Sequence, residues 1–358
     1  MDLKTWVFEI SQGNYDIDLG DSNAPCQSLT DLEFNSNIVL DYGWDQGSLD
    51  LRKEISKLYN CNADEILVTH GAQEGLFLIY LQLIKKGDEI IALTPGWPQS
   101  FEAPKKLGGK VISIPILKKS KFNIEGVKDA LSDRTKILVL NSPNNPNTYE
   151  INNLDIENIK KVIGDREITI VFDDEYLSNL EMSHHRNFSN SISVSSISKI
   201  YGFPGLRIGW IKSNKYLTNK LREMKHLTSI SNSVLNENLA TNILREKERY
   251  ISDYKRMWDS GKEILEKWIY KHRNTFTDIN ISSAPFAWIR LHEGIDSLDF
   301  CKHMIRSERI MIMPSNVFGI DQHIRLTFVR DIHELSGALD RISYQIKNHY
   351  VLNENSNE

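Results

Sequence analysis

The sequence predicts an α/β fold, with helices on both faces of a mostly parallel central sheet, and a smaller α+β domain at the C-terminus. Between about residues 42 and 210, short apolar runs alternate with amphipathic stretches. Strands separated by helix-period segments imply βαβ units and a mostly parallel sheet. A long helical region follows, and the chain then alternates strands and helices again, which indicates a second domain.

The individual elements follow from apolar periodicity. In the first part, strands are predicted at residues 65–70, 88–93, 110–116, 136–140, 167–173 and 192–198, with a helix at 72–86. A helical stretch with polar breaks covers residues 216–272. In the last part, strands are predicted at 286–291, 310–314 and 324–329, and helices at 296–307 and 333–349.

The length of 358 residues suggests two domains, at roughly 100–200 residues per domain. We expect a large domain over residues 41–240 and a small domain over 241–358. Residues 1–40 contain no long periodic run, so we expect them to pack on the small domain or on a partner subunit. The last residues, 353–358, are polar and are expected to form a frayed tail.

Composition excludes several classes of function. A net charge of −5 gives no electrostatic footprint for nucleic acid. No run approaches the ~18 apolar residues of a membrane span, and the N-terminus lacks the layout of a signal peptide, so we expect a cytoplasmic protein. Cys26, Cys61 and Cys301 lie far apart, so neither a disulfide framework nor a metal site is predicted.

The strongest chemical signal is Lys199, which follows a predicted strand and precedes a glycine-rich stretch, residues 201–210. A desolvated lysine, or one near other cations, has a lowered pKa and can condense with an aldehyde as a Schiff base. The glycines and proline beyond it impose an irregular chain that lets Arg207 fold back towards Lys199. With the hydroxyl of Ser196, three residues before the lysine, this guanidinium makes a phosphate clamp.

This stretch resembles the S-x-x-K-x-x-G-x-x-G-x-R signature of class I/II aminotransferases, the fold-type I pyridoxal 5′-phosphate (PLP) enzymes. The resemblance implies that Lys199 holds PLP, and that the other motifs of the family occur in a fixed order. They are found between about Leu19 and Arg330, which is nearly the whole chain.

Two of these motifs concern the cofactor's phosphate. Residues 42–52 are similar to the family's Y-x-x-x-x-G-x-x-x-(L/F)-R segment, in which the tyrosine reaches the cofactor of the other subunit. The resemblance therefore gives Tyr42 this role and implies a homodimer. Gly71, Ala72 and Gln73 follow a strand and open a helix, whose first turn binds phosphate naturally.

Three further motifs concern the cofactor's ring. Trp97, in a loop similar to P-x-(Y/W)-P, would stack on the ring. Asn145, in a segment similar to N-P-x-N-P-T-G but with Asn147-Thr148 at its end, would hydrogen-bond the phenolic oxygen. Tyr176 would bind the same oxygen.

Residues 173–176 resemble the D-x-x-Y motif of the family. Asp173 would keep the ring nitrogen protonated, so that the ring accepts electrons from a substrate carbanion. Asp174 and Glu175 are expected to face solvent or a partner, because a run of acidic residues is usually a solvated face.

The last motif, residues 323–328, resembles the family's (I/V)-R-(L/I)-(S/T)-(F/Y). Arg325 would bind the substrate's α-carboxylate through two parallel hydrogen bonds. Gly20 belongs to a loose match to the segment that passes over the substrate. Asp21, Trp44 and Asp45 are open as contributors to the side-chain pocket.

The function that the resemblance implies is transamination between an L-amino acid and a 2-keto acid, with Lys199, Asp173 and Tyr176 as the catalytic residues. A PLP-dependent lyase, cyclase or oxidase has the same constellation and stays open. A non-catalytic PLP-binding regulator is disfavoured, because the chain has no spare length for a DNA-binding domain. A nucleotide-binding protein without PLP is disfavoured because no G-x-G-x-x-G or G-x-x-x-x-G-K-(S/T) pattern follows a strand.

Overall fold

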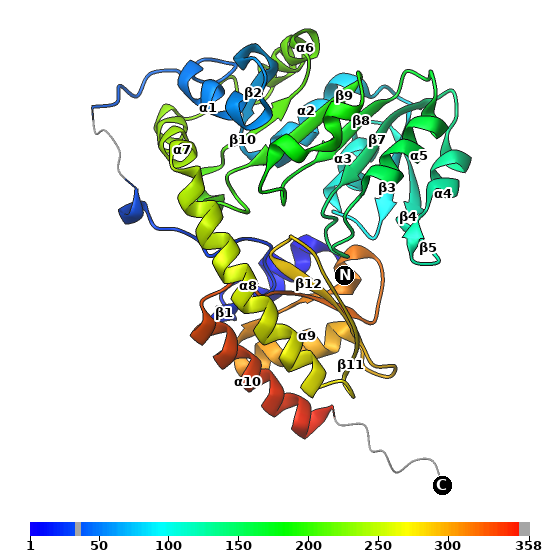
Figure 1. Cartoon of the computed structure of the whole chain (residues 1–358), viewed down its shortest axis with the longest axis vertical. Coiled ribbons are helices and arrows are strands. Elements are labelled where there is room, and N and C mark those ends of the chain that lie inside the picture. Colours follow the sequence, from blue (N-terminus) through cyan, green and yellow to red (C-terminus); the bar gives the residue numbers. More distant parts are fainter. Residues whose placement is uncertain (33–36, 351–358) are drawn as a thin grey trace. The chain divides into compact units, whose positions relative to one another are not determined.

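In the computed structural model, which describes residues 1–32 and 37–350, the predicted strands of the first part come together in one sheet. Its strands, in spatial order, are β2 (Ile66–Thr69), β10 (Gly209–Lys212), β9 (Ser191–Ser196), β8 (Thr169–Asp173), β7 (Thr135–Asn141), β3 (Glu89–Thr94) and β4 (Lys110–Pro115). Figure 1 shows this sheet. Only β10 runs antiparallel to its neighbours β2 and β9, so the prediction of a mostly parallel sheet is confirmed.

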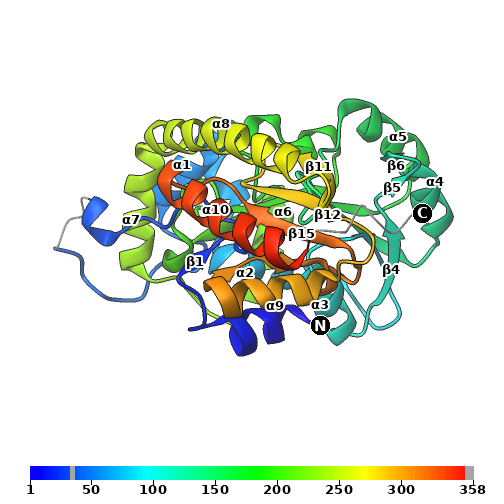
Figure 2. The ribbon, with the colours of Figure 1, turned by 90° about the horizontal axis from the view of Figure 1, so that it is seen from below.

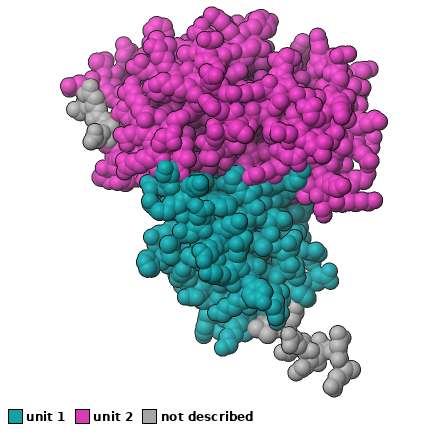
Figure 3. Space-filling view, in the orientation of Figure 1, with its two compact units in different colours: residues 1–25, 146–149, 252–358 teal, residues 26–145, 150–251 magenta. Residues whose placement is uncertain are grey.

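The sheet and its helices form the larger of two units, residues 26–145 and 150–251 (unit 2). Unit 1 comprises residues 1–25, 146–149 and 252–358, and Figure 3 colours the two units separately. The tail predicted at residues 353–358 lies outside the described residues. Among the residues described, none of the helices is both long and apolar enough to cross a membrane.

Helices cover both faces of the central sheet. They are α1 (Leu49–Tyr59), α2 (Gly71–Leu83), α3 (Gln99–Lys106), α4 (Ile124–Ala130), α5 (Asn153–Ile163), α6 (Lys215–Lys225) and α7 (Val234–Arg245). Tyr59 of α1 hydrogen-bonds Ser193, whereas Gly75 of α2 packs on the next residue of the strand, Val194. Successive strand residues point to opposite faces, so α1 and α2 lie on opposite sides of the sheet. Every residue of β2, β8 and β9 is buried, as expected for strands covered on both faces.

The strand register places the ends of several strands along one edge of the sheet. Asn141 and Asp173, the last residues of β7 and β8, pair with each other, and Asp173 pairs with Val194, two residues before the end of β9. Because β10 runs the opposite way, its first residue, Gly209, lies between Ser196 and Thr69, the last residues of β9 and β2. The loops that leave these strands are therefore collected at one edge, where ligands bind in open α/β sheets.

Unit 1 contains a four-stranded antiparallel sheet in the order β11 (Phe276–Ile281), β12 (Phe286–Leu291), β15 (His323–Thr327) and β14 (Met313–Pro314). A short parallel pair joins β1 (Ile17–Asp18) to β13 (Ile310–Met311). Its helices are α8 (Lys247–Lys271), which begins in unit 2, α9 (Ser297–Glu308) and α10 (Ile332–His349). Figure 2 shows α9 and α10 next to each other, in agreement with their contacts.

Five of the described strands were not predicted, namely β1, β5 (Leu117–Lys118), β6 (Lys121–Phe122), β10 and β11, and two predicted elements are divided. The strand β10 was missed because it has only four residues and follows the glycine-rich stretch. The strand β11 was missed because it is mostly polar and exposed at the edge of its sheet. The helical stretch 216–272 is three helices, α6, α7 and α8, because the chain turns between Lys225 and Ser233, whose side chain caps α7. The strand predicted at 310–314 is split between β13 and β14, which pair with different strands.

Candidate active site

Lys199 lies just beyond β9, at the edge where the strand ends of unit 2 meet. Its side chain is half-buried, and its charge acts on two neighbouring carboxyl groups, those of Asp173 and Glu175. The fold therefore places the predicted Schiff-base lysine beside the acidic end of β8. This proximity results from the pairing of β8 with β9 and could not be read from the sequence spacing alone.

A close approach joins Arg207 to the first turn of α2. Gly71 has φ of +75°, and a Cβ added there would lie 2.5 Å from Nη2 of Arg207. A Cβ on Gly209 would lie 2.5 Å from the backbone nitrogen of Ala72. Glycine is therefore favoured at residue 71 by its positive φ, and it is required at residue 209, where a Cβ would collide with the backbone at the start of the helix.

This cradle has the donors that an anion needs. The N–H groups of the first turn of α2 carry partial positive charge, and the Arg207 guanidinium carries a full one. The Ser196 hydroxyl lies at the end of β9, beside Gly209, and donates to Oε2 of Glu175. The structure thus brings together the residues predicted to bind phosphate, namely Gly71, Ala72, Gln73, Ser196 and Arg207.

Next to the cradle, hydrogen bonds join two pairs of residues that were predicted to bind the cofactor. Nδ2 of Asn145 donates to Oη of Tyr176 over 3.1 Å, and both side chains are buried. Nε1 of Trp97 donates to Oε1 of Gln73 over 3.1 Å, which ties the aromatic loop to the first turn of α2. The motif departure at Asn147 and Thr148 leaves the Asn145–Tyr176 contact in place.

Asp173, the last residue of β8, is buried beside Lys199. Burial, and to a smaller extent the charges of Glu175 and Asp174, raise the pKa of Asp173 to about 8, against the opposing effects of the Glu175 backbone N–H and the charge of Lys199. Burial disfavours the ionised form of such a carboxyl group unless a cation lies next to it. A protonated ring nitrogen is a cation of this kind.

The prediction that Asp174 and Glu175 face solvent or a partner is wrong. Their side chains are only 2% and 9% exposed. Oδ2 of Asp174 accepts hydrogen bonds from the hydroxyls of Ser183 and Ser193. Oε2 of Glu175 accepts one from the hydroxyl of Ser196, over 3.0 Å. These partners lie 9 to 21 residues away along the chain, so the acidic run by itself does not reveal them.

Asp174 belongs to a polar network on the α1 side of the sheet. Ser193 is also hydrogen-bonded to the Tyr59 hydroxyl, and Ser183 to Nδ1 of His185. Burial raises the pKa of Asp174 to about 6, against the two serine hydrogen bonds. Burial also lowers the pKa of His185 to about 3, so that the imidazole is neutral. The network satisfies Asp174 within the protein itself.

Arg325, the residue predicted to bind the substrate carboxylate, lies on β15 in unit 1 and is 2% exposed. Its Nη2 donates to the backbone oxygens of Gly20 and Asp21 over 2.6 and 3.1 Å. The rings of Phe286 and Phe318 flank the guanidinium, at 5.0 and 5.5 Å from their centroids. The structure therefore brings Gly20 and Arg325 together, and the backbone and the rings hold the guanidinium in place.

The three residues left open as pocket contributors have different surroundings. The Asp21 carboxylate pairs with Arg330, and that of Asp45 pairs with Arg222 and His226. Trp44 is 74% exposed, and Tyr42 is 84% exposed. The two carboxylates are thus already paired with cations, whereas the aromatic side chains project from the surface.

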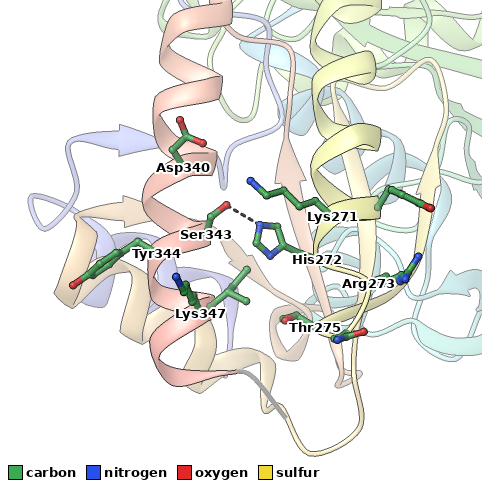
Figure 4. A pocket seen from close by; sticks show the side chains of 11 residues that line it. Lys271, His272, Arg273, Thr275, Asp340, Ser343, Tyr344 and Lys347 are labelled. Carbon is green, nitrogen blue, oxygen red and sulfur yellow. Dashed lines mark hydrogen bonds between the residues drawn. The ribbon is translucent and has the colours of Figure 1, made fainter. Parts of the chain in front are cut away.

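Unit 1 also contains a hollow of about 860 Å³ that includes no predicted site residue. Figure 4 shows it between the end of α8 and α10, where His272 hydrogen-bonds the Ser343 hydroxyl over 2.8 Å. Its lining includes the basic side chains of Lys271, Arg273 and Lys347.

Comparison with known proteins identifies the family. Residues 7–342 match the model of the family described as aminotransferase class I and II. The chain belongs to the class I and II aminotransferases. The fold is accordingly that of the fold-type I PLP enzymes, and the cofactor is PLP.

Relatives of this aminotransferase-family enzyme carry several names. The chain is 25% identical over 311 residues to a (5-formylfuran-3-yl)methyl phosphate transaminase of Methanocaldococcus jannaschii, with 83% of this chain and 81% of the relative covered. It is 25% identical over 315 residues to an aspartate aminotransferase of Thermotoga maritima, with the same coverage. A PLP-dependent aminotransferase of Streptococcus suis shares its fold, with a TM-score of 0.87, 23% identity, and 95% and 96% of the two chains covered.

Another relative is named for a different reaction. The chain is 22% identical over 292 residues to a capreomycidine synthase of Streptomyces vinaceus, with 79% of this chain and 75% of the relative covered. The family and the cofactor are thus shown by the comparisons, whereas relatives of similar identity differ in the reaction that they are named for.

Proposed function

We propose that this enzyme is an aminotransferase that moves an amino group between an L-amino acid and a 2-keto acid. The observation that carries the proposal is the convergence of Lys199, Asp173 and the Asn145–Tyr176 pair at one edge of the sheet, in a chain of the aminotransferase family. Transamination needs a lysine that moves protons and a site that tunes the cofactor's ring, and this set of residues suits both needs.

The residues suit PLP at both of its ends. The phosphate would lie in the cradle of Gly71, Ala72, Gln73, Ser196 and Arg207, where a Cβ on Gly71 would collide with the guanidinium. The ring nitrogen would lie against Asp173, whose pKa is raised chiefly by burial and which a cation on the ring would stabilise as an anion. Asn145 and Tyr176 would donate hydrogen bonds to the phenolic oxygen, and Trp97 would cover one face of the ring.

When bound, PLP supplies an electron sink for the electron pair of the substrate's Cα–H bond. Lys199 acts as general base and acid, and moves the proton from the substrate's α-carbon to C4′ of the cofactor. Asp173 holds the proton on the ring nitrogen. Arg325 orients the substrate through its α-carboxylate, with Gly20 in the segment that its guanidinium holds.

We also propose a homodimer in which Tyr42 completes the partner subunit's phosphate site. Tyr42 and Trp44 lie in a segment with other large exposed apolar side chains, Val39 and Leu40. Exposed apolar groups that are contiguous along the chain favour burial against another surface. Members of this family are generally dimeric, which supports the proposal.

A second candidate is a PLP-dependent cyclase or lyase, which the capreomycidine synthase relative favours. An oxidase would share the same first steps. These reactions differ in the fate of the electron pair after the proton has left the α-carbon. They do not leave the amino group on the cofactor at the end of a turnover.

The test is a single turnover of the holoenzyme with each of a panel of L-amino acids, without a keto acid. Transamination predicts one equivalent of pyridoxamine phosphate and one of 2-keto acid per active site. Addition of 2-oxoglutarate or pyruvate should then regenerate PLP. Continued consumption of the amino acid without pyridoxamine phosphate would favour the cyclase or lyase and exclude the aminotransferase.

A further inference from the structure

Lys225, the last residue of α6, is a fully buried lysine that has no part in the function proposed above. Its Nζ donates hydrogen bonds to the backbone oxygens of Asp45 and Val68, over 3.0 and 2.8 Å, and to Oδ1 of Asn232. An ammonium group has three N–H donors, so each of them has an acceptor here. Lysine is almost never fully buried unless its charge is paired or hydrogen-bonded in this way.

The three acceptors come from segments that lie far apart along the chain. Val68 is part of β2, which leads within three residues to the proposed phosphate cradle, and Asn232 lies in the turn between α6 and α7. Asp45 comes three residues after Tyr42. A Cβ added to Gly43 would lie 3.2 Å from the backbone oxygen of Asn232, so the residue next to Tyr42 packs directly on that turn. One ammonium group therefore joins the Tyr42 segment to β2 and to the turn.

The end of α6 also holds the carboxylate of Asp45. Its Oδ2 lies 3.2 Å from Nε of Arg222 and 2.8 Å from Nε2 of His226. Tyr42, in contrast, is 84% exposed. The segment is thus fixed at its base, while the tyrosine ring projects from the surface and is available to a second subunit.

We propose that Lys225 is a positioning residue for Tyr42: its ammonium group fixes residues 42–45 against β2 and the α6–α7 turn, and so directs the Tyr42 hydroxyl to the cofactor's phosphate in the partner subunit. The inference rests on the homodimer and the role of Tyr42 proposed above. In this arrangement Lys225 contacts neither cofactor nor substrate. It contributes to PLP binding only through Tyr42.

The arrangement needs the charged form of Lys225, because a neutral amine has only two N–H donors for three oxygens. Burial lowers the pKa of Lys225 to about 8. The carboxylates that face it, those of Glu74 on α2, Glu237 on α7 and Asp45 before α1, oppose this effect. The three hydrogen bonds are therefore complete below about pH 8 and incomplete above it, and the contribution of Tyr42 to PLP binding should fall over the same range.

The first test is a double-mutant cycle between Lys225 and Tyr42. The full-length enzyme is freed of cofactor, and the dissociation constant of PLP is measured at pH 7 by tryptophan fluorescence. Tyr42→Phe and Lys225→Met should each raise this constant about tenfold, because each prevents the Tyr42 hydroxyl from binding the phosphate. The double variant should bind no more weakly than Tyr42→Phe, since both changes remove the same contact. An additive loss of about a hundredfold would overturn the proposal.

Two controls accompany the cycle. Lys220→Met replaces a lysine on the same helix that is 39% exposed and paired with Glu223, and its PLP affinity should stay within about twofold of the wild type. With pyridoxal, which lacks the phosphate, Tyr42→Phe and Lys225→Met should also stay within about twofold of the wild type. A loss with pyridoxal as large as with PLP would overturn the proposal. Sedimentation should show a dimer in each case, and a monomeric Lys225→Met would assign the lysine to the interface as a whole and overturn it as well.

A second measurement leaves the protein core unchanged and stands even if Lys225→Met does not fold. The ratio of the PLP dissociation constants of Tyr42→Phe and the wild type should fall from about tenfold at pH 6.5 to less than about threefold at pH 9, as Lys225 loses its proton. The titrations of Lys199, Asp173 and the phosphate are common to both proteins and cancel in the ratio. A ratio that is constant over this range would contradict the proposal.

Asn232→Asp supplies a readout that a merely structural role of Lys225 would not move. The carboxylate lies beside the ammonium group and favours its charged form. When Tyr42→Phe is introduced into Asn232→Asp, the ratio of the PLP dissociation constants should therefore still be above about fivefold at pH 9. A fall with the same midpoint as in the wild-type background would mean that another group carries the titration, and the role of Lys225 would be wrong.

Failure of this inference can be distinguished from failure of the proposed function. If Tyr42→Phe binds PLP as tightly as the wild type at pH 7, the proposed role of Tyr42 is wrong, and that of Lys225 with it. If Tyr42→Phe weakens binding whereas Lys225→Met does not, the role of Tyr42 stands and that of Lys225 is wrong. Pyridoxamine phosphate formation tests transamination independently of these affinities.

Discussion

The end of β8 carries two kinds of buried carboxyl group side by side. Asp174 points to the α1 side of the sheet, where the hydroxyls of Ser183 and Ser193 satisfy it. Asp173 and Glu175 lie near Lys199, and Oε1 of Glu175 has no partner among the described residues. Asp174 is thus hydrogen-bonded within the fold, whereas Asp173 lies beside Lys199, where the cofactor is proposed to bind.

Lys199→Ala should give the largest effect on the ligand side of this comparison. Without its amine, neither the covalent link to the cofactor nor the proton transfer at the α-carbon is available. The visible absorption of the bound cofactor should disappear, and turnover should fall by roughly a thousandfold or more. Absorption spectra and single-turnover assays would check this, and a fully coloured, active variant would show that another lysine carries the chemistry.

Asp173→Asn should lower turnover but raise the stability of the cofactor-free protein at high pH. Turnover should fall by roughly a hundredfold or more, because the neutral amide cannot hold the ring nitrogen protonated. Burial raises the pKa of Asp173 from 3.8 to about 8 in the cofactor-free protein, so stability present at low pH is lost as pH rises towards 8. The cofactor-free variant should therefore unfold in urea with a flatter pH dependence, and at pH 9 it should be more stable than the wild type.

An unchanged pH dependence of unfolding in Asp173→Asn would contradict this account. It would mean that Asp173 is already paired with a cation in the cofactor-free protein. Urea unfolding at pH 5, 7 and 9 measures this dependence. Asp174→Asn, measured in parallel, should change the pH dependence only below about pH 6, since the pKa of Asp174 is raised to about 6, whereas that of Asp173 is raised to about 8.

Arg325→Lys extends the comparison to a buried cation in unit 1. The lysine keeps the charge but loses the planar pair of donors, so KM for the amino acid should rise about 10- to 100-fold. The dissociation constant of PLP should stay within about twofold, since Arg325 is proposed to bind substrate and not cofactor. A loss of PLP affinity equal to the rise in KM would show that Arg325 only supports the fold of the Gly20 segment.

Asp174→Asn should give the smallest effect on chemistry. At pH 7 the loss of hydrogen bonds with Ser183 and Ser193 and the removal of a charge that burial disfavours have opposite effects, so the free energy of unfolding should change by no more than about 1–3 kcal/mol. The turnover number should stay within about twofold of the wild type, since the group points away from Lys199. Steady-state kinetics below the unfolding temperature would check this, and a large loss of activity at unchanged stability would break the comparison.

The sequence predicted the central strands well, because residues 137–140 are apolar throughout and residues 192–198 combine Ile and Val with small serine residues. Such runs can be covered on both faces of a sheet. The order of the motifs also led to the residues that meet at the sheet edge. The burial of Asp174 and Glu175 was missed, since three consecutive acidic residues are usually solvated. Their partners, Ser183, Ser193 and Ser196, come from later segments that only the strand pairing brings near.

The position of β10 could not be predicted from the sequence for the same reason, because it depends on strand pairing. Four residues after a glycine-rich stretch carry little periodicity, yet this strand brings Gly209 between the ends of β2 and β9 and so shapes the phosphate cradle. The collision of a Cβ on Gly71 with Arg207 depends on it as well. Contacts of this kind are set by tertiary packing and have no local pattern.

The most direct test of the central claim is the fate of the amino group in one turnover. Mixed with a good L-amino acid donor and no keto acid, the holoenzyme should convert its PLP to pyridoxamine phosphate, with one 2-keto acid released per active site. Added 2-keto acid should reverse the change. Release of several product molecules per site with PLP retained throughout would contradict the account and assign the site to a cyclase or lyase.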